Sequence, residues 1–299
     1  ERIVRRRRIG LYEMHRCAVH GRIFRRKNQR IGRDVRRIDR RGDVAYLALT
    51  HASKHNALDW EMLSALVDAA ETLKRDRALR GVILHAEGPS FCSGLDFPKF
   101  TKEPARMARA FAKVGLRSTN LFQEACWAYR RLPVPVLAVT HGRCFGGGLQ
   151  LALAADFRFT TPDCEFSIME AKWGLIPDMT GSVTLRELMP IDQAKRLTMT
   201  GRVFNGTEAK SYNLVTEVSA DPMAAAEALM AELVTRSPDS VAATKQLFQE
   251  TWVASEDAAF SLESRLQALV LMGKNQRAAM NANFKKEAPR FGRRLRILG

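Results

Sequence analysis

Glycines and small residues follow two apolar segments of the sequence, at points where a strand would give way to a helix. The first junction runs from Ser90 to Asp96, and the second runs from His141 to Gly148 and ends in three glycines. Glycine lets a ligand approach the backbone, and a helix N-terminus leaves N–H groups free with a partial positive charge. Two such junctions in one sheet could direct N–H groups at one oxygen atom. That arrangement would be an oxyanion hole, which stabilises a carbonyl oxygen that gains negative charge.

Each junction alone has a simpler interpretation, because glycines also permit tight turns. A phosphate-binding loop is a third possibility. The second junction, however, has no Lys followed by Ser or Thr after its glycines, and it lacks the G-x-G-x-x-G spacing. The presence of both junctions in one chain therefore favours the oxyanion hole.

Short apolar segments alternate with helical periodicity from Val44 onward, and these elements would position the two junctions. The order strand, helix, strand, strand, helix, strand is typical of an α/β fold with a parallel sheet. Helical signals dominate after residue 180. Strands are predicted at 44–49, 81–85, 136–139 and 157–160, and helices at 59–74 (capped by Asp59), at 149–155, from Thr207 to a left-handed cap at Asn213, and from Ser237.

The net charge of +16 is unevenly distributed along the chain. Residues 42–284 hold 26 basic and 27 acidic residues, so the basic excess lies in residues 1–41 and 285–299. A nucleic-acid-binding domain needs a basic face on a folded surface or a dedicated basic arm. We therefore expect no nucleic-acid partner for the body of the protein.

Residues 1–41 are rich in arginine and show no apolar periodicity. We predict a disordered, solvated extension; an organelle-targeting presequence and an RNA-binding arm are the alternatives. The predicted organisation is this extension at 1–41, an α/β core at 42–236 and a helical region at 237–299.

The five cysteines form no CxxC pair and no metal-ligand spacing, which fits a reducing compartment without disulfides and predicts no metal site. No apolar run is long enough to span a membrane, and no secretory signal is visible. We expect a soluble protein of the cytoplasm, or of the mitochondrial matrix if residues 1–41 are a presequence. Four histidines lack a partner motif and are expected to be non-catalytic: His51, His55, His85 and His141.

Taken together, seven short segments resemble the enoyl-CoA hydratase/isomerase (crotonase) superfamily, in order and with similar spacing. The resemblance covers about residues 35–285, and one departure is His51-Ala52, where many members have Arg-Pro. The matching segments are 56–58, 91–96, 142–148, 155–158, 170–178, 197–201, and Glu208-Ala209 before Leu214-Val215.

The resemblance implies a crotonase-like spiral of β-β-α turns with a C-terminal helical region that forms trimers, often paired into hexamers. It implies an acyl-CoA thioester substrate, with CoA as part of the substrate and no separate cofactor. The backbone N–H groups of Leu95 and Gly147 would form the oxyanion hole. Further contacts with the substrate would come from Ala57, Leu58, Asp96 and Gly146.

The resemblance also indicates which carboxylates could act. Hydratases of the family carry two glutamates, of which the second matches Glu170 and the first falls on Gln150, which cannot accept a proton. Asp178 lies eight residues after Glu170. The dienoyl-CoA isomerases resemble the chain through this pair, although they usually carry a carboxylate at position 150, and 3-hydroxyisobutyryl-CoA hydrolases share the spacing. Each of the three residues also has a plain structural alternative, as a surface, packing or turn residue.

We therefore predict an enzyme that isomerises double bonds, from 3,5-dienoyl-CoA to 2,4-dienoyl-CoA or from 3-enoyl-CoA to 2-enoyl-CoA. Glu170 and Asp178 would move protons, and Gln150 would complete the catalytic set. Hydration of 2-enoyl-CoA is the second hypothesis, and hydrolysis of 3-hydroxyacyl-CoA is the third. From a different class, the chain could be an RNA-binding relative that acts through its basic tails.

Overall fold

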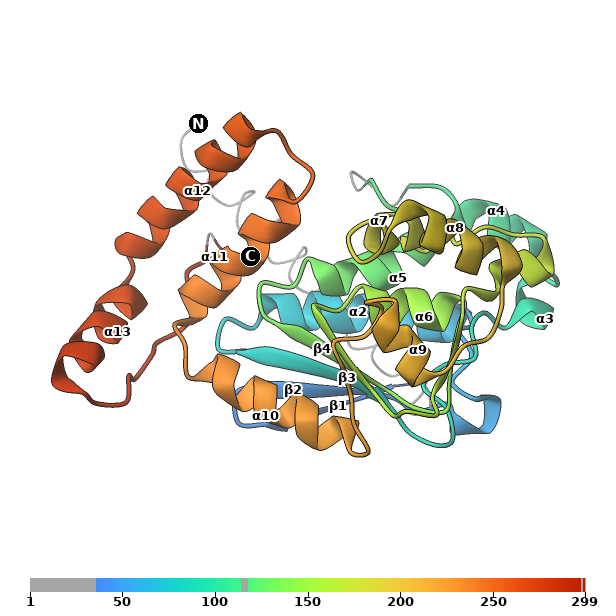
Figure 1. Ribbon diagram of the computed structural model, residues 1–299, viewed down its shortest axis with the longest axis horizontal. Coiled ribbons are helices and arrows are strands. Elements are labelled where there is room, and N and C mark those ends of the chain that lie inside the picture. Colours follow the sequence, from blue (N-terminus) through green and yellow to red (C-terminus); the bar gives the residue numbers. More distant parts are fainter. Residues whose placement is uncertain (1–35, 114–117, 297, 299) are drawn as a thin grey trace, which may run out of the picture. The chain divides into compact units, whose positions relative to one another are not determined.

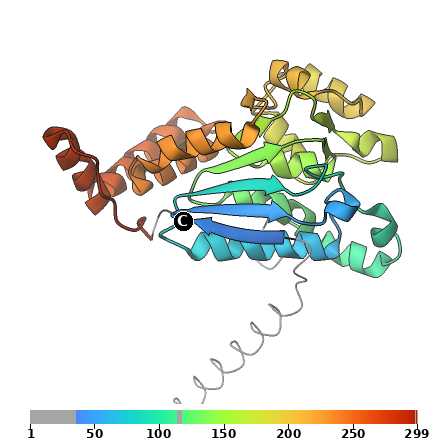
Figure 2. The same ribbon diagram turned by 90° about the horizontal axis from the view of Figure 1, so that it is seen from below.

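A sheet of six strands lies at the centre of the part of the chain that the structure describes. The structure is a computed structural model, and it describes residues 36–113, 118–296 and 298. The strand order is β1-β2-β3-β4-β6-β8, and β1 to β4 lie side by side in Figure 2. All neighbours are parallel except β1 and β2. The strands are β1 (Arg36–Arg41), β2 (Val44–Leu49), β3 (Gly81–Ala86), β4 (Val136–Thr140), β5 (Arg143–Phe145), β6 (Phe157–Thr160), β7 (Glu165–Ser167) and β8 (Glu217–Val218).

Strand β1 corrects the predicted boundary of the basic extension. Residues 36–41 were assigned to the extension, but they pair along their whole length with β2. Their composition hid the strand, because arginines dominate it and Ile38 is its only apolar residue. Charged side chains are common on edge strands, where they discourage pairing with other chains. The predictions for residues 1–35 lie outside the described residues.

The expected helices are present, with two shifts. Asp59 caps the first long helix by accepting a hydrogen bond from Met62 N. The helix after the triple glycine begins at Gly147 and not at Leu149, and the helix predicted from Thr207 begins after Asn205, whose side chain caps it. The α-helices are α2 (Trp60–Arg75), α3 (Phe97–Phe100), α4 (Pro104–Ala110), α5 (Leu121–Arg130), α6 (Gly147–Leu153), α7 (Gly181–Leu185), α8 (Ile191–Thr200), α9 (Gly206–Ser211), α10 (Pro222–Val234), α11 (Pro238–Thr251), α12 (Glu256–Leu271) and α13 (Lys274–Lys285), and the 3-10 helices are η1 (Ala52–Lys54) and η2 (Met169–Trp173).

Both faces of the main sheet are buried, which explains its near-continuous apolar strands. Helix α10 lies along one face, below the strands in Figure 1. Every second residue of a strand points to the α10 face. Leu47, Leu84 and Ala138 lie between these residues, point to the opposite face and are also fully buried. The cluster under α10 comprises Tyr46, Ile83, Leu137, Val139, Phe159, Ala226 and Met230.

A smaller sheet brings the two glycine-containing junctions together. Strands β5 and β7 pair in parallel, and Cys92 of the first junction forms a parallel bridge with Cys144 of β5. A second bridge joins Leu58 to Leu95. Because the two junctions are thus neighbours in one small sheet, groups from both can face the same space.

Three helices follow the core and belong to the same compact unit of the described chain. Asp239 of α11 holds them to the C-terminal segment, since its carboxylate accepts hydrogen bonds from Asn275 and from Leu295 N. That segment returns to the core, where Arg294 N donates to Arg77 O.

The four cysteines of the described ranges are buried and free: Cys92, Cys126, Cys144 and Cys164. Burial raises the pKa of each thiol, to about 12 for Cys92 and about 11 for Cys164. In the same ranges, no helix combines the length and the hydropathy that membrane crossing requires.

Candidate active site

The peptide of Leu58 determines where the first junction directs its N–H groups. Leu58 N donates to Gly94 O at 2.8 Å, and Leu58 O accepts from Asp96 N at 2.9 Å. In a parallel bridge these bonds use the residues on either side of Leu95, so the N–H group of Leu95 points away from Leu58. Leu95 N donates to no other described residue. It is therefore available to a ligand.

The second junction supplies a matching group. Gly146 has a φ of 49°, in the region that favours glycine, and its N–H donates to Ser167 O. The chain turns there into α6, so Gly147 N is one of the N–H groups that a helix start leaves unpaired. A Cβ atom on Gly94 would lie 3.9 Å from Gly147 N. The two junctions thus approach each other closely and can donate to one oxygen.

A cavity of about 100 Å³ lies where the junctions meet. The segment that carries Glu170 and Asp178 also lines it. The cavity is therefore bordered by N–H donors and by carboxylates. Its lining residues are Ser93, Gly94, Leu95, Phe97, Gly146, Gly147, Met169, Glu170, Trp173, Leu175, Asp178 and Met179.

Of the two carboxylates in this cavity, Glu170 is buried and Asp178 is half-buried, and neither has a cation beside it. Burial raises the pKa of the Glu170 carboxyl, and the charge of Asp178 raises it further, while hydrogen bonds from its own backbone and from Gln150 lower it. Burial likewise raises the pKa of Asp178. Within the described ranges, no Lys, Arg or His forms an ion pair with either group. Carboxyl groups with raised pKa values are suited to accept and return protons near neutral pH.

Gln150 touches Glu170 but does not line the cavity. Its Oε1 atom accepts hydrogen bonds from Met179 N at 2.9 Å and from Gly181 N at 2.8 Å. The intervening Thr180 has a φ of 81°, which is rare for a β-branched residue and turns both flanking N–H groups toward Gln150. Because two donors face Oε1, the amide nitrogen must face Glu170, and it donates to Oε1 of Glu170 at 2.6 Å.

This contact leaves Glu170 with one free oxygen. Its Oε1 atom is held by the amide of Gln150, whereas its Oε2 atom is buried and has no hydrogen-bond partner. A buried polar atom without a partner is costly and usually has a functional explanation. Here, Oε2 is the oxygen of Glu170 that is left to bond a ligand.

The structure brings most of the predicted site residues together. Leu95, Gly146, Gly147, Glu170 and Asp178 line one cavity. Ala57, Leu58, Asp96 and Gln150 do not line it. Leu58 packs behind the cavity, since a Cβ on Gly147 would lie 3.2 Å from its Cδ1 atom, and Asp96 pairs with Lys54 at 3.0 Å.

Sequence reasoning missed the apolar part of the lining. Phe97 and Trp173 stack with their ring centroids 5.1 Å apart, at the end of the segment that carries Glu170. Met169 and Met179 flank the two carboxylates in the sequence. The signal was available, because Trp173 and Leu175 are large apolar residues in a turn between two candidate acids.

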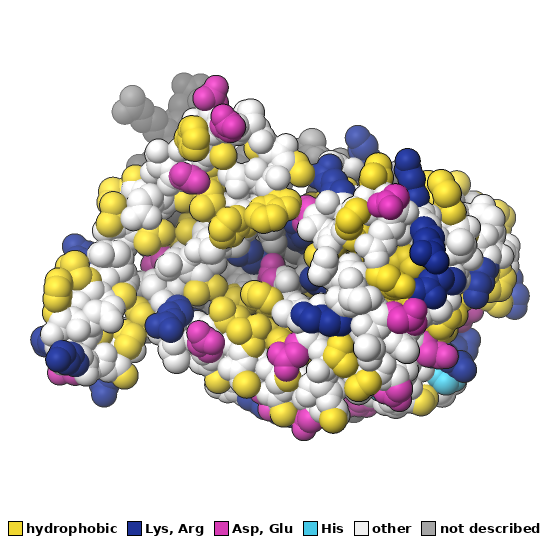
Figure 3. All heavy atoms as spheres, viewed as in Figure 1, with side chains coloured by type: hydrophobic (Ala, Val, Ile, Leu, Met, Phe, Trp, Pro, Cys, Tyr) yellow, Lys and Arg dark blue, Asp and Glu magenta, His cyan; other side chains and the backbone are white. Residues whose placement is uncertain are grey.

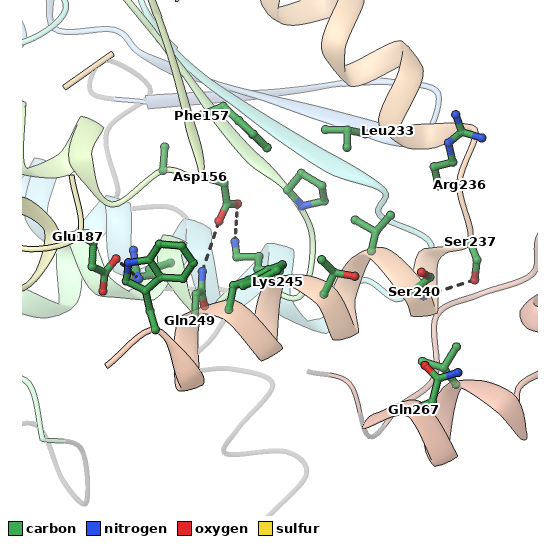
Figure 4. Close-up of a pocket in the computed structure, with 18 of the residues that line it drawn as sticks. Asp156, Phe157, Glu187, Leu233, Arg236, Ser237, Ser240, Lys245, Gln249 and Gln267 are labelled. Atoms are coloured by element: carbon green, nitrogen blue, oxygen red, sulfur yellow. Dashed lines mark hydrogen bonds and ion pairs between the residues drawn. The ribbon is translucent and has the colours of Figure 1, made fainter. Parts of the chain in front are cut away.

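A much larger hollow of about 910 Å³ lies elsewhere and contains none of the predicted site residues. It is bordered by α10 to α13 and by the ends of β6 and α5, and Figure 3 shows hydrophobic side chains around it. The acidic side chains that line it are paired with cations, as Figure 4 shows. Asp156 binds Lys245 at 2.8 Å, and Glu187 binds Arg130 at 2.5 Å. Arg158 also lines this hollow, and its guanidinium donates to the carbonyl oxygens of Leu214 and Ala155. We place the candidate site in the smaller cavity because there the N–H groups of both junctions meet two carboxylates.

Comparison with known proteins agrees with this geometry. The sequence model of the enoyl-CoA hydratase/isomerase family matches residues 39–294. The chain belongs to this family. Among its relatives is the enoyl-CoA hydratase EchA19 of Mycobacterium tuberculosis, 28% identical over 86% of this chain and 96% of the relative. The peroxisomal Delta(3,5)-Delta(2,4)-dienoyl-CoA isomerase of Arabidopsis thaliana is also 28% identical, over 84% of this chain and 93% of its own.

A solved structure supports the same assignment. The enoyl-CoA hydratase of Mycobacterium smegmatis superposes with a TM-score of 0.78 at 28% identity, covering 86% of this chain and 98% of that one. The predicted crotonase-like α/β fold is thereby confirmed, and the protein is an acyl-CoA enzyme of the enoyl-CoA hydratase/isomerase family.

Proposed function

We propose that this enzyme moves a carbon–carbon double bond in an acyl-CoA thioester. The N–H groups of Leu95 and Gly147 hold the thioester oxygen. One carboxylate of the pair Glu170 and Asp178 takes a proton from the acyl chain, which leaves an enolate conjugated with the double bond. The other carboxylate returns a proton at the far end of the conjugated system. The step needs no oxidant or reductant, because one proton leaves carbon and another replaces it.

The observation that carries this proposal is the way Gln150 is bonded. Activation of a water molecule by paired carboxylates would need a proton acceptor at position 150. The amide oxygen of Gln150 already accepts from Met179 N and Gly181 N, and its nitrogen is directed at Glu170. Neither end is free to take a proton from water. Isomerisation needs no water and therefore no proton acceptor at position 150. Glu170 and Asp178, which line the same cavity, could transfer both protons.

Hydration of 2-enoyl-CoA is the second candidate. The relatives favour it, because EchA19 and the Mycobacterium smegmatis protein are both named enoyl-CoA hydratases. In that reaction Glu170 alone would have to hold and deprotonate the water. The dienoyl-CoA isomerase of Arabidopsis thaliana is equally similar at 28% identity, so sequence similarity does not separate the two reactions.

A panel of thioesters tests the proposal. We would assay crotonyl-CoA, 3-hexenoyl-CoA, a 3,5-dienoyl-CoA and a 3-hydroxyacyl-CoA, and would separate products by mass and absorbance. Conversion of the 3-enoyl or 3,5-dienoyl substrate without a gain in mass is expected to be the fastest reaction. If the enzyme hydrates crotonyl-CoA faster than it isomerises either substrate, the hydratase hypothesis replaces ours.

We also propose that the protein forms a trimer or a trimer-based hexamer. Large apolar side chains are exposed on α11 to α13, as expected of surfaces that pack on another chain. Light scattering at micromolar concentration tests this, and a monomer would contradict it. The exposed residues there include Phe248, Trp252, Phe260, Leu271, Met272 and Phe284.

A further inference from the structure

Two aromatic rings form one edge of the candidate active site. Phe97 of α3 and Trp173 at the end of η2 stack with 28° between their planes. Both line the cavity that contains Glu170 and Asp178. Although it is packed against Phe97, the side chain of Trp173 remains 61% exposed. The neighbouring Leu175 is 46% exposed, so apolar surface continues from the cavity to the outside.

The cavity is too small to hold a whole substrate. Its volume is about 100 Å³, whereas pockets that enclose drug-sized ligands measure roughly 300–1,000 Å³. The space beside Leu95, Gly147 and the carboxylates can hold the thioester carbonyl and the reacting carbons. The rest of the acyl group must therefore extend over the rim, where Trp173 offers the largest exposed apolar surface.

We propose that Phe97 and Trp173 bind the acyl group and select flat, uncharged groups, aromatic or extended and conjugated, over saturated chains. The proposal rests on the proposed acyl-CoA site. A flat π-system can lie in offset contact with the exposed face of Trp173. Such aromatic pairs gain stabilisation in addition to that from the burial of apolar area. A saturated ring of similar size lacks this additional stabilisation.

The lining of the cavity disfavours two other kinds of acyl group. No Lys, Arg or His is among the described residues that line it, so a carboxylate that entered it would meet Glu170 and Asp178 without a cation. A quaternary ammonium group prefers several ring faces arranged as a cage. Phe97 and Trp173 lie nearly parallel and cover each other, so the pair does not form such a cage.

Binding of two thioesters of similar shape tests the proposal without requiring turnover. Phenylacetyl-CoA and cyclohexylacetyl-CoA carry rings of similar size, but only the first is flat. We expect the full-length enzyme to bind phenylacetyl-CoA about threefold to tenfold more tightly, measured by calorimetry. Trp173→Leu and Phe97→Leu should each reduce this ratio toward one, and Trp173→Phe should keep most of it. Quenching of tryptophan fluorescence by phenylacetyl-CoA should disappear in Trp173→Leu.

Trp252→Leu is the matched control, because Trp252 is 62% exposed but lines the larger hollow. In this variant, the ratio of the two affinities and the quenching of tryptophan fluorescence should equal those of the wild type. Light scattering would check that the assembly state is unchanged. Equal affinities for the two thioesters, no measurable binding of either, or a ratio that survives both leucine variants would overturn the proposal. Tighter binding of 4-(trimethylammonio)butyryl-CoA than of phenylacetyl-CoA would also overturn it. A preserved ratio in an enzyme that only hydrates would refute the proposed reaction and leave this inference standing.

Discussion

The larger hollow and the small cavity both shield acidic groups from water, and the two regions treat these groups differently. In the larger hollow, Asp156 and Glu187 are largely shielded from water, and each binds a cation, Lys245 or Arg130. In the small cavity, Glu170 is buried and Asp178 is half-buried, but no cation of the described chain pairs with either. The pKa values of this second pair are raised, whereas burial lowers the pKa of Lys245 in the first region.

The contrast separates stability from chemistry. A buried charge with a partner holds segments of the fold together, as Lys245 does by binding Asp156 and also donating to Val134 O at 3.0 Å. A buried carboxylate without a cation is held at a free-energy cost that the fold must offset elsewhere. Such a cost is common where a group must change protonation during a reaction.

The largest expected effect comes from removing the carboxylates of the small cavity. Glu170→Gln and Asp178→Asn should each lower isomerase turnover at least about a hundredfold, because each removes a group that transfers a proton. Glu187→Gln, the matched change in the larger hollow, should leave turnover near that of the wild type. Steady-state kinetics on the best substrate of the panel measure all three. A silent Asp178→Asn would mean that the cavity does not use a carboxylate pair.

A second change should disturb stability and spare the chemistry. Lys245→Met leaves Asp156 without its cation, and Asp156 is 18% exposed. We expect a loss of about 2 kcal/mol in the free energy of unfolding, below the roughly 3–5 kcal/mol of a fully buried pair. Urea unfolding measures the loss, and the double variant Lys245→Met with Asp156→Asn should recover part of it. If turnover at saturating substrate fell as strongly as in Glu170→Gln, the separation of the two regions would fail.

The smallest expected effect is a shift in the pH profile. In Gln150→Glu, one carboxylate oxygen can still accept from Met179 N and Gly181 N. The second oxygen takes the place of the amide nitrogen, which in the wild type donates to Oε1 of Glu170 at 2.6 Å. Repulsion between the carboxylates raises the pKa of Glu170. Glu170 must be ionised to accept a proton. When the pH is lowered, the activity of the variant should therefore begin to fall at a higher pH than that of the wild type. We expect the midpoint of the acid limb of the kcat/KM profile to rise by about one pH unit, which corresponds to about 1.4 kcal/mol.

Gln249→Glu provides the control for this profile. Gln249 donates to Asp156 at 3.3 Å in the larger hollow, where Lys245 supplies a counter-charge. The same substitution beside a carboxylate should therefore leave the acid limb unchanged. An unchanged limb in Gln150→Glu would show that Glu170 is not the group that titrates.

The sequence predicted the parts of the site that depend on backbone geometry and on spacing along the chain. Glycines between a strand and a helix predicted the two junctions, and the family resemblance supplied the individual positions Leu95, Gly147, Glu170 and Asp178. The bonding of Gln150 was not predictable, because it depends on the left-handed backbone at Thr180, 30 residues away in the sequence. Phe97 and Trp173 come from separate elements, so no local pattern announces that they meet.

The buried cysteines have a practical consequence for measuring the third hypothesis, thioester hydrolysis. That reaction releases free CoA, which is commonly followed by the colour that its thiol gives with an aromatic disulfide reagent. Cys92, Cys126, Cys144 and Cys164 are enclosed and their thiols stay protonated, so the native protein should contribute almost no colour from them. Each of these sulfur atoms becomes reactive only when its part of the fold opens. The same reagent, added in the absence of substrate, would therefore report how often the core exposes itself to solvent.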